Sequence, residues 1–199
     1  MIRRLPLIPT IIVALAAATM IGLGVWQLQR AQWKERLLAQ YSQAERLPPI
    51  AWPSVPPKDD ALPLYRHATG VCLRTIGGRA VAGENRSGEP GYVQIVDCAT
   101  GAEGPGMSVE LGWSKNPNAR PDWRGGLVSG VIAPDRLTRM RLVAATAPPG
   151  LEPSAPPSIS SISNNHRSYA VQWFSFAAIA LLIYGLAVRK RLNEAKAAQ

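Results

Sequence analysis

Two long apolar segments, one near each end of the 199-residue chain, dominate the pattern of hydrophobic and polar positions. No charged side chain occurs from Leu5 to Gln29, and none occurs from Ser168 to Val188. A helix that crosses a bilayer needs about 20 mainly apolar residues, so both segments are long enough. The pattern therefore predicts two transmembrane helices, at residues 5–28 and 168–188.

The first segment also has the basic start of a signal peptide, because Arg3 and Arg4 precede it. Its apolar stretch is longer than the roughly 7 to 15 residues of such peptides, and no A-x-A-like cleavage site ends it. We therefore interpret residues 5–28 as an uncleaved anchor. Within it, Ala14, Ala18 and Gly22 recur at every fourth position, which suits either close approach of another helix or ordinary contact with lipid.

The second segment carries a stripe of polar, aromatic and small residues at helical spacing. The stripe consists of His166, Ala170, Trp173, Ala177, Ala180 and Tyr184. Because such a stripe is unusual on a lipid-facing surface, we expect it to face protein or a ligand. Asn164 and Asn165, directly before it, suit the N-terminal cap of the helix.

Basic residues at both ends of the chain predict its orientation in a membrane, because short flanks with Lys and Arg stay in the cytoplasm. These residues are Arg3, Arg4, Arg189, Lys190, Arg191 and Lys196. We expect both termini, including a tail at residues 189–199, on the cytoplasmic side of the cell inner membrane. The loop between the spans then lies in the periplasm or an equivalent compartment.

Between the spans, two proline-rich stretches enclose a region with the cadence of β-strands. Residues 29–63 indicate a helical extension that ends near Leu47, followed by an extended linker, and residues 144–167 indicate a second linker. In residues 64–143, short apolar runs alternate with glycine-rich turns. The predicted strands are Ala68–Leu73, Arg79–Ala82, Tyr92–Val96, Met107–Leu111 and Leu127–Ile132. The expected fold is a membrane protein whose two transmembrane helices flank a small, mainly antiparallel, barrel-like β domain outside the cytoplasm.

The only cysteines, Cys72 and Cys98, both fall in this domain near predicted strand ends. In an oxidising compartment a disulfide between them is the favoured interpretation. A catalytic redox pair usually has closer spacing, and a tetrahedral metal site needs more than two ligands. Two free thiols remain as the alternative.

The net charge of +9 does not predict nucleic-acid binding, because the basic residues are spread along the loop and the span ends. Arg136, Arg139 and Arg141 form a loose basic cluster after the last predicted strand. We interpret the cluster as a solvated face, with an acidic partner or a lipid headgroup as the alternative.

No motif in the chain indicates an enzyme, since nucleophile elbows, phosphate loops, zinc-protease helices and dinucleotide fingerprints are all missing from the sequence. His67 stands alone and is interpreted as a structural or surface residue. Two histidines in a chain do not make an ordinary first-row metal site.

His166 differs, because one neutral imidazole is enough to ligate a heme iron. Trp26, Tyr169, Trp173 and Phe174 would supply aromatic walls at the mouth of the helix pair, and Arg30 and Arg167 would meet the propionates. The alternative is that His166 and Arg167 only cap and anchor the helix. Trp26 and Trp33 are likewise either headgroup anchors or parts of a site.

Several blocks of the sequence, in order along nearly the whole chain, resemble the surfeit-locus family of cytochrome c oxidase assembly proteins. They are Gly24-Val25-Trp26-Gln27-Leu28-Gln29-Arg30 with Trp33-Lys34, Tyr65-Arg66 with Gly70, Gly112-Trp113, Pro148 to Pro153, and Asn164-Asn165-His166 with Tyr169-Ala170 and Gln172-Trp173-Phe174. The family's usual Asn-Arg-Gly-Trp strand reads Glu110-Leu111-Gly112-Trp113 here. The membrane blocks match more closely than the loop does.

The resemblance implies a bacterial, non-enzymatic assembly factor for heme-copper oxidases that binds heme A transiently and helps its delivery to the catalytic subunit. The family's histidine corresponds to His166, and its tryptophan and glutamine correspond to Trp26 and Gln27. Implied partners are the oxidase catalytic subunit, heme A synthase, other assembly factors and membrane lipid. The competing hypotheses are a heme-free scaffold that holds an oxidase subunit or heme A synthase, and a thiol oxidoreductase that uses Cys72 and Cys98.

Overall fold

The structure is a computed structural model that describes residues 6–53, 55, 57–101 and 105–197. The chain divides into two compact units, which we describe separately. One unit joins residues 1–37 with residues 163–199, and the other comprises residues 38–162.

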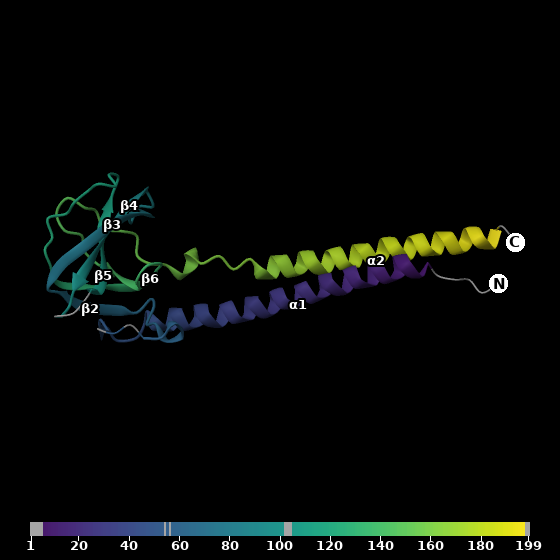
Figure 1. Ribbon diagram of the computed structural model, residues 1–199, viewed down its shortest axis with the longest axis horizontal. Coiled ribbons are helices and arrows are strands. Elements are labelled where there is room, and N and C mark those ends of the chain that lie inside the picture. Colours follow the sequence, from purple (N-terminus) through teal and green to yellow (C-terminus); the bar gives the residue numbers. More distant parts are fainter. Residues whose placement is uncertain (1–5, 54, 56, 102–104, 198–199) are drawn as a thin grey trace. The chain divides into compact units, whose positions relative to one another are not determined.

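The first unit contains two long helices, α1 (Leu7–Ala44) and α2 (His166–Ala197), which run side by side in opposite directions (Figure 1). The last turns of α1, from residue 38, belong to the second unit. Pro6 and Pro9 are tolerated at the start of α1 because backbone N–H groups in the first turn have no acceptor within the helix. The N–H group that proline lacks is therefore not missed there. Thr10 donates its backbone N–H and its hydroxyl to the Pro6 carbonyl, which closes this first turn. α1 continues well past the apolar segment, as the sequence predicts.

Small residues lie along the seam between the helices. The buried residues of α1 are Ala17, Gly24 and Ala31, each seven positions from the next, and on α2 Ala170 and Ala177 are also buried seven apart. This 3.5-residue repeat keeps one stripe of each helix against the other. A Cβ atom on Gly24 would lie 2.6 Å from the Phe174 ring, so the close approach of α2 at this position leaves no room for a side chain.

The α2 stripe that begins at His166 faces α1, so the expectation that it faces protein is confirmed. The small residues expected to approach a helix, Ala14, Ala18 and Gly22, are instead exposed, and a Cβ atom on Gly22 would meet nothing within 4 Å. Close approach through these residues is therefore wrong for the contact with α2. Their alternative interpretation, contact with lipid, agrees with their exposure.

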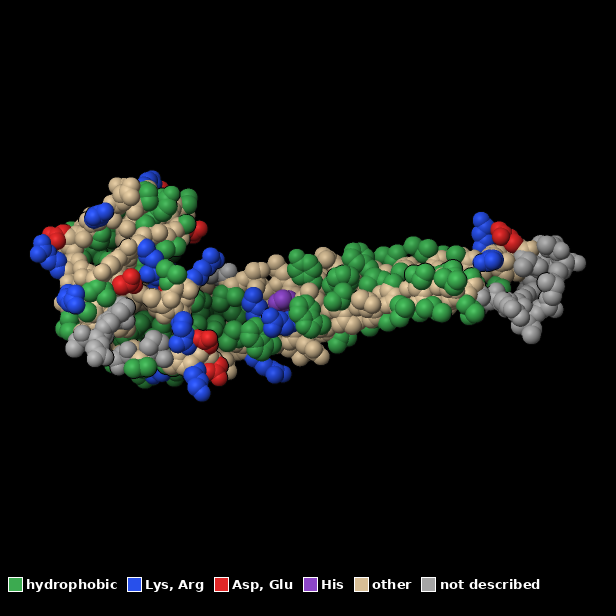
Figure 2. Space-filling view, in the orientation of Figure 1, with side chains coloured by type: hydrophobic (Ala, Val, Ile, Leu, Met, Phe, Trp, Pro, Cys, Tyr) green, Lys and Arg blue, Asp and Glu red, His purple; other side chains and the backbone are tan. Residues whose placement is uncertain are grey.

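Both helices are long and apolar enough to cross a membrane. In their most apolar 18-residue windows only 11% of α1 and 6% of α2 is buried, so most apolar side chains point outward. Figure 2 shows these side chains covering the helix pair between charged groups at its ends. Such a surface is stable in lipid and not in water. The chain is a two-span membrane protein with a small β domain, as its sequence predicts.

The second unit is built on one seven-stranded sheet with strand order β1-β2-β6-β7-β5-β4-β3. The strands are β1 (Ile50–Ala51), β2 (His67–Cys72), β3 (Arg74–Glu84), β4 (Pro90–Ala99), β5 (Pro105–Ser114), β6 (Gly126–Asp135) and β7 (Arg139–Ala144), with 3-10 turns η1 (Asp59–Ala61) and η2 (Ile159–Ser161). Neighbouring strands are antiparallel except for the parallel pairs β1/β2 and β5/β7. All five strands predicted from the sequence are present.

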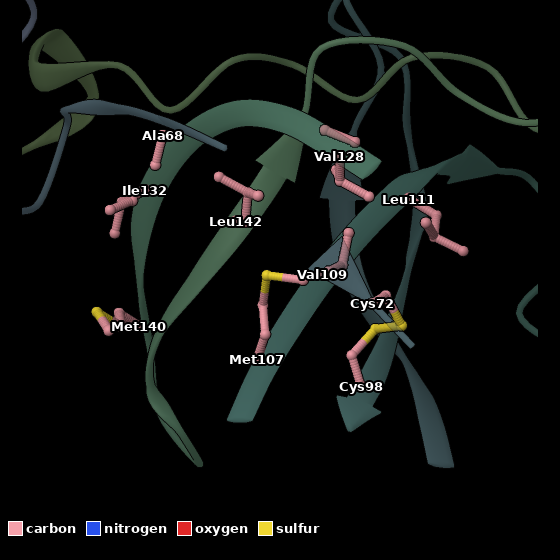
Figure 3. Packing of buried hydrophobic residues seen from close by; sticks show 11 residues of the cluster. Ala68, Cys72, Cys98, Met107, Val109, Leu111, Val128, Ile132, Met140 and Leu142 are labelled. Atoms are coloured by element: carbon pink, nitrogen blue, oxygen red, sulfur yellow. A yellow bond between two sulfur atoms is a disulfide. The ribbon is translucent and has the colours of Figure 1, made fainter. Parts of the chain in front are cut away.

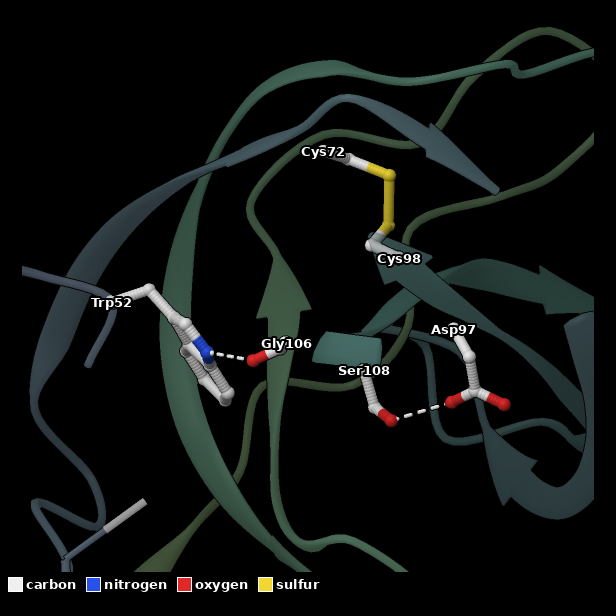
Figure 4. The surroundings of a disulfide bond; sticks show 6 residues. All are labelled: Trp52, Cys72, Asp97, Cys98, Gly106 and Ser108. Atoms are coloured by element: carbon white, nitrogen blue, oxygen red, sulfur yellow. Dashed lines mark hydrogen bonds between the residues drawn. A yellow bond between two sulfur atoms is a disulfide. The ribbon is translucent and has the colours of Figure 1, made fainter. Parts of the chain in front are cut away.

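The sheet rolls up because β2 and β3, far apart in the strand order, are joined by the single residue Leu73. The Leu73 backbone N–H donates to the Ala99 carbonyl over 2.9 Å, which brings the end of β2 to the end of β4. A disulfide between Cys72 and Cys98 bridges the same two strand ends (Figure 4). These contacts curve the sheet into a barrel-like shape, although its strand order is open.

The rolled sheet encloses one main hydrophobic core (Figure 3). Its largest fully buried side chains are Cys72, Cys98, Val109, Ile132, Met140 and Leu142. Trp52 packs at the rim of this core and donates its indole N–H to the Gly106 carbonyl over 2.8 Å (Figure 4). Near the end of α1, the Tyr41 ring lies 4.7 Å from the Tyr65 ring, so these last turns extend the core.

Both proline-rich stretches contribute to the sheet, which the sequence analysis did not anticipate. The first contains β1, and Trp52 just after it donates its backbone N–H to the Thr69 carbonyl. In the second, Glu152 exchanges two backbone hydrogen bonds with Trp113, at 2.6 and 2.9 Å. A Cβ atom on Gly112 would lie 2.6 Å from the Glu152 carbonyl, so this close approach requires glycine there.

Candidate functional site

The candidate site lies where α2 begins, and its central contact joins His166 to Gln27 of α1. The His166 Nδ1 atom and the Gln27 Oε1 atom are 2.7 Å apart across the seam. Because a carboxamide oxygen only accepts, Nδ1 carries the proton in this contact. In the neutral form of this tautomer the unshared electron pair lies at Nε2, which has no hydrogen-bond partner among the described residues.

The opposite end of the seam carries a second polar contact, between the Thr10 hydroxyl and the Tyr184 hydroxyl. Between the two polar contacts, the buried alanines and Gly24 let the two helices approach closely. The two polar pairs therefore fix how far one helix can slide along the other, and they position His166 opposite Gln27.

The other candidate residues divide between the two sides of the seam, because helix residues rotate by about 100° per position. On α1, Trp26 and Arg30 fall on one side of Gln27 and Glu35 falls on the other. On α2, Tyr169 and Arg167 fall on opposite sides of His166. Arg167 pairs with Glu35 at 2.9 Å, and Arg30 and Tyr169 lie on the other side of the seam. Trp26, two positions after the buried Gly24, lies about 160° around α1 from the seam and faces away from α2.

This arrangement separates the two arginines that the sequence analysis placed together at the propionates. Arg167 has a carboxylate partner in Glu35 on one side, and the Lys34 ammonium on α1 donates to the Ser163 carbonyl just before α2. These contacts fasten the start of α2 to α1. Of these two arginines, Arg30 is the one on the same side of the seam as Tyr169.

Arg30 lies between two indole rings on the surface of α1. Its guanidinium carbon is 4.9 Å from the Trp33 ring centroid and 6.0 Å from the Trp26 ring centroid. Cation–π contacts of this kind hold an arginine in place without neutralising its charge. Trp26 is 50% exposed and Trp33 is 54% exposed, so both rings also remain available to lipid or a ligand.

The aromatic residues of α2 complete the surroundings of His166. Tyr169 is 50% exposed on the side of the seam that carries Arg30. Trp173 lies half-buried in the seam, one turn or so beyond Ala170, and stacks edge-on against Phe176 at 6.3 Å. Phe174 lies against Gly24 and belongs to the helix contact.

These residues fit a heme on two observations. A ligating histidine usually has its other ring nitrogen held by a hydrogen bond, and Gln27 holds His166 in that way. The buried Asn164 Oδ1 atom, two residues before His166, has no hydrogen-bond partner in the structure. A buried polar atom without a partner indicates a bound group or water at that position.

The β domain contains a charged network that sequence analysis missed. Arg79 of β3 pairs with Asp97 of β4 at 3.3 Å and with Asp135 of β6 at 2.8 Å. Arg141 of β7 pairs with Asp135 at 3.4 Å and with Glu110 of β5 at 2.6 Å. The network thus joins one residue from each of five strands, and the Glu110 side chain is only 4% exposed.

The interpretation of Arg136, Arg139 and Arg141 as a solvated face is therefore wrong for Arg141, which belongs to the network. Arg139, which begins β7, stays on the surface and pairs with the exposed Asp59. The alternation of Arg139, Met140, Arg141 and Leu142 is a strand pattern whose apolar half enters the core. This alternation is visible in the sequence, but the charged residues led us to interpret the segment as a surface cluster.

Asp135 is the residue of the network that pairs with both arginines, Arg79 and Arg141. Burial alone raises its pKa, but hydrogen bonds from the Thr138 backbone and hydroxyl and from Arg79 outweigh that effect and lower the pKa to about 2. The carboxylate is therefore charged at every physiological pH, and the network is structural.

The remaining sequence candidates do not extend the site. His67 begins β2 with an exposed side chain. Cys72 and Cys98 are joined in the disulfide and are both buried in the core. No group of three or more metal-ligating side chains occurs in the part of the chain that the structure describes.

Comparison with known proteins covers both the helices and the β domain. Residues 14–178 match the sequence model of the SURF1 family. A curated relative, a SURF1-like protein of Monosiga brevicollis, is 27% identical over 220 residues, covering 86% of this chain and 84% of the relative. The matched span includes Trp26, Gln27 and His166 as well as the whole sheet. The chain belongs to the SURF1 family, a family known for cytochrome oxidase assembly.

Proposed function

We propose that this chain is a non-enzymatic assembly factor for a heme-copper cytochrome c oxidase, and that it binds heme A transiently and helps its delivery to the catalytic subunit. Membership of the SURF1 family supports the first part. The observation that carries the second is the 2.7 Å contact between His166 Nδ1 and Gln27 Oε1, because it presents Nε2 as an iron ligand.

In this proposal heme A is a cargo, and each residue of the site has a separate role. His166 would ligate the iron and Gln27 would fix the orientation of its ring. Trp26, Tyr169 and Trp173 would contact the macrocycle, since aromatic rings bury large apolar area at little entropic cost. Arg30 would meet a propionate, since Arg167 already pairs with Glu35 on the other side of the seam.

A carrier of this kind lies in the inner membrane with its β domain outside the cytoplasm. The Lys and Arg residues at the two chain ends support that orientation. Reporter fusions at the C-terminus and in the β domain test it. An active cytoplasmic reporter inside the β domain would contradict the orientation.

Absorption spectra of the full chain, purified from cells that make heme A, test the cargo. The wild type should carry a Soret band, and His166→Ala should lose most of it. His67→Ala is the matched control, because it removes the only other histidine and should leave the band unchanged. Gln27→Leu should weaken the band without abolishing it. A colourless wild type, or a His166→Ala variant with a full band, would refute heme binding.

The same contacts also favour a second function, a heme-free scaffold, if their role is to hold the two helices together. His166 with Gln27, and Arg167 with Glu35, join the two helices to each other. Under this function, photo-crosslinkers at Trp26 or Trp173 would reach an oxidase subunit or heme A synthase. His166→Ala would then leave the heme content of the assembled oxidase intact, whereas a heme carrier would lower it.

A further inference from the structure

The outward face of the sheet carries a pocket whose floor is formed by two rows of side chains across β2, β6 and the end of β7. The first row is His67, Val131 and Val143, and the second row is Thr69, Ser129 and Ala145. The residues next to these rows in sequence, Ala68, Ile132 and Leu142, point into the core (Figure 3). Because side chains alternate between the two faces of a strand, both rows face outward. We call this site the outer pocket.

The outer pocket has the size and the lining of a small-ligand site. Its volume is about 400 Å³, within the range of such pockets. Pro49 and the neighbouring Pro156 and Pro157, which come from the two proline-rich stretches, also line it. Val143 is 6% exposed and Val131 is half-buried, so the apolar part of the floor is largely sheltered from water.

A single arginine supplies a permanent charge to the outer pocket. Arg86 lies in the turn between β3 and β4, where the Asn85 side chain accepts two backbone N–H groups at 2.9 and 3.0 Å. The Arg86 backbone N–H donates to the Pro153 carbonyl, and its guanidinium donates to the Ala145 carbonyl over 2.6 Å. Among the described residues no carboxylate lines the pocket or pairs with Arg86. Its remaining N–H groups are therefore available to an anion.

Ser154 adds a polar group that has no partner among the described residues. The residue is 4% exposed, and its buried Oγ atom forms no hydrogen bond. Ser154 is held close to Arg86, because its backbone bridges to Asn85 and the Ala155 N–H donates to the Glu84 carbonyl over 2.9 Å. A buried polar atom without a partner indicates a bound group or water at that position.

We propose that the outer pocket binds a small monocarboxylate with an apolar body, such as a medium-chain fatty acid. One arginine matches the single charge of a carboxylate, whereas a phosphate monoester carries a charge of about −1.5 to −2. Arg86 binds the carboxylate, the Ser154 hydroxyl donates to it, and the apolar body covers Val131 and Val143. The outer pocket shares no residue with the His166 site, so the proposal does not depend on heme binding.

Equilibrium dialysis of labelled octanoate against the full chain in nanodiscs tests the ligand class, with binding to empty nanodiscs subtracted. Octanoate should bind saturably. Octanol has the same apolar body without the charge, and acetate has the head without the body. Both should bind about tenfold more weakly, or worse, and octyl phosphate should also bind more weakly than octanoate. No saturable octanoate binding, equal binding of octanol, or tighter binding of octyl phosphate would overturn the proposal.

Two variants test the polar contacts by the same dialysis. Arg86→Gln should weaken octanoate binding about tenfold or more, because a hydrogen-bonded charge is lost. The matched control is Arg74→Gln, which removes an exposed arginine outside the pocket and should leave the affinity unchanged. Ser154→Ala should weaken binding about fivefold, the effect of one hydrogen bond. Its urea midpoint without octanoate should stay as in the wild type, since the Ser154 hydroxyl has no protein partner to lose.

A third variant fills the outer pocket and leaves Arg86 with its Ala145 contact. Ser129→Phe adds a ring at an exposed position of the floor and should abolish octanoate binding. Leu127→Phe is the matched control, because Leu127 lies two positions away on the same face of β6, is 73% exposed and does not line the pocket. Urea-dependent proteolysis should show both variants folded. Full octanoate binding by folded Ser129→Phe or by Arg86→Gln would place the ligand elsewhere and overturn the proposal.

Discussion

The helix pair and the β domain are stabilised in opposite ways. The β domain buries a continuous core, closes it with a disulfide and ties five strands together through a charged network. The helix pair buries little beyond small residues in one seam, and the polar contacts between its two helices, in the part of the chain that the structure describes, lie towards its ends. The β domain is stabilised by its own internal contacts, whereas the helix pair depends on the surrounding lipid. A mutation should therefore affect one unit and leave the other intact.

The largest expected effect is loss of the disulfide from the β domain. Replacing Cys72 and Cys98 by alanine frees a loop with a sequence separation of 26. The chain-entropy relation gives a loss of about 3.5 kcal/mol in the free energy of unfolding. Urea-dependent proteolysis of the full chain measures it, and the midpoint for the domain should fall markedly. An unchanged midpoint would mean that the core alone holds the sheet closed.

The charged network should give the next largest effect. Arg141→Met leaves Glu110, 4% exposed, without its partner, and should cost about 3 kcal/mol by the same proteolysis measurement. Adding Glu110→Gln should recover much of the loss, because the buried charge is then removed as well. If the double variant is no better than Arg141→Met, the loss comes from packing of the arginine stem.

The pH dependence of the domain should reflect Asp135. Its folded pKa of about 2 lies below the ordinary value of 3.8, so its contribution is fully present above the unfolded pKa. That contribution, about 2 kcal/mol, is lost as the pH falls from about 4 towards 2. Asp135→Asn should lower the unfolding midpoint at pH 7, and the difference from wild type should shrink over this window. A difference that stays constant down to pH 2 would contradict the assignment.

The smallest effect should come from the helix seam and should leave the β domain unchanged. Gly24→Ala places a methyl group against Phe174, whereas Gly22→Ala places one in open space and is the matched control. In an Ala31→Cys background, where Ala31 is 1% exposed, maleimide labelling reports seam opening. Labelling should rise several-fold with Gly24→Ala and remain unchanged with Gly22→Ala. Equal labelling of the two would show that the seam tolerates extra volume.

The contrast between the units also explains what the sequence could predict. Uncharged stretches of sufficient length define both spans, and the α2 stripe from His166 to Tyr184 shows its seam directly. The α1 seam was harder to predict from the sequence. Its residues, Ala17, Gly24 and Ala31, repeat every seven positions. The four-residue repeat of Ala14, Ala18 and Gly22 faces outward instead. Helix contact follows the heptad here, and many small residues in one span make several stripes look plausible.

In the β domain, prediction failed where a strand signal was short or charged. β1 has two residues, too few for any alternation. β7 alternates correctly, but Arg139 and Arg141 suggested a surface. The pairing of Arg141 with Glu110 depends on the parallel contact of β5 with β7, which joins strands distant in sequence. The His166 contact with Gln27 likewise spans 139 residues, and only the packing of the two helices reveals it.

The position of the disulfide has a consequence for the order in which the chain matures. Cys72 and Cys98 sit at the open end of the β3/β4 hairpin, so this local segment alone brings the two thiols together. Hairpins of such low contact order form early, and oxidation can precede synthesis of β6 and β7. The covalent ring would then act as a nucleus to which the later strands add. Alkylation of nascent chains arrested at increasing lengths would date the bond.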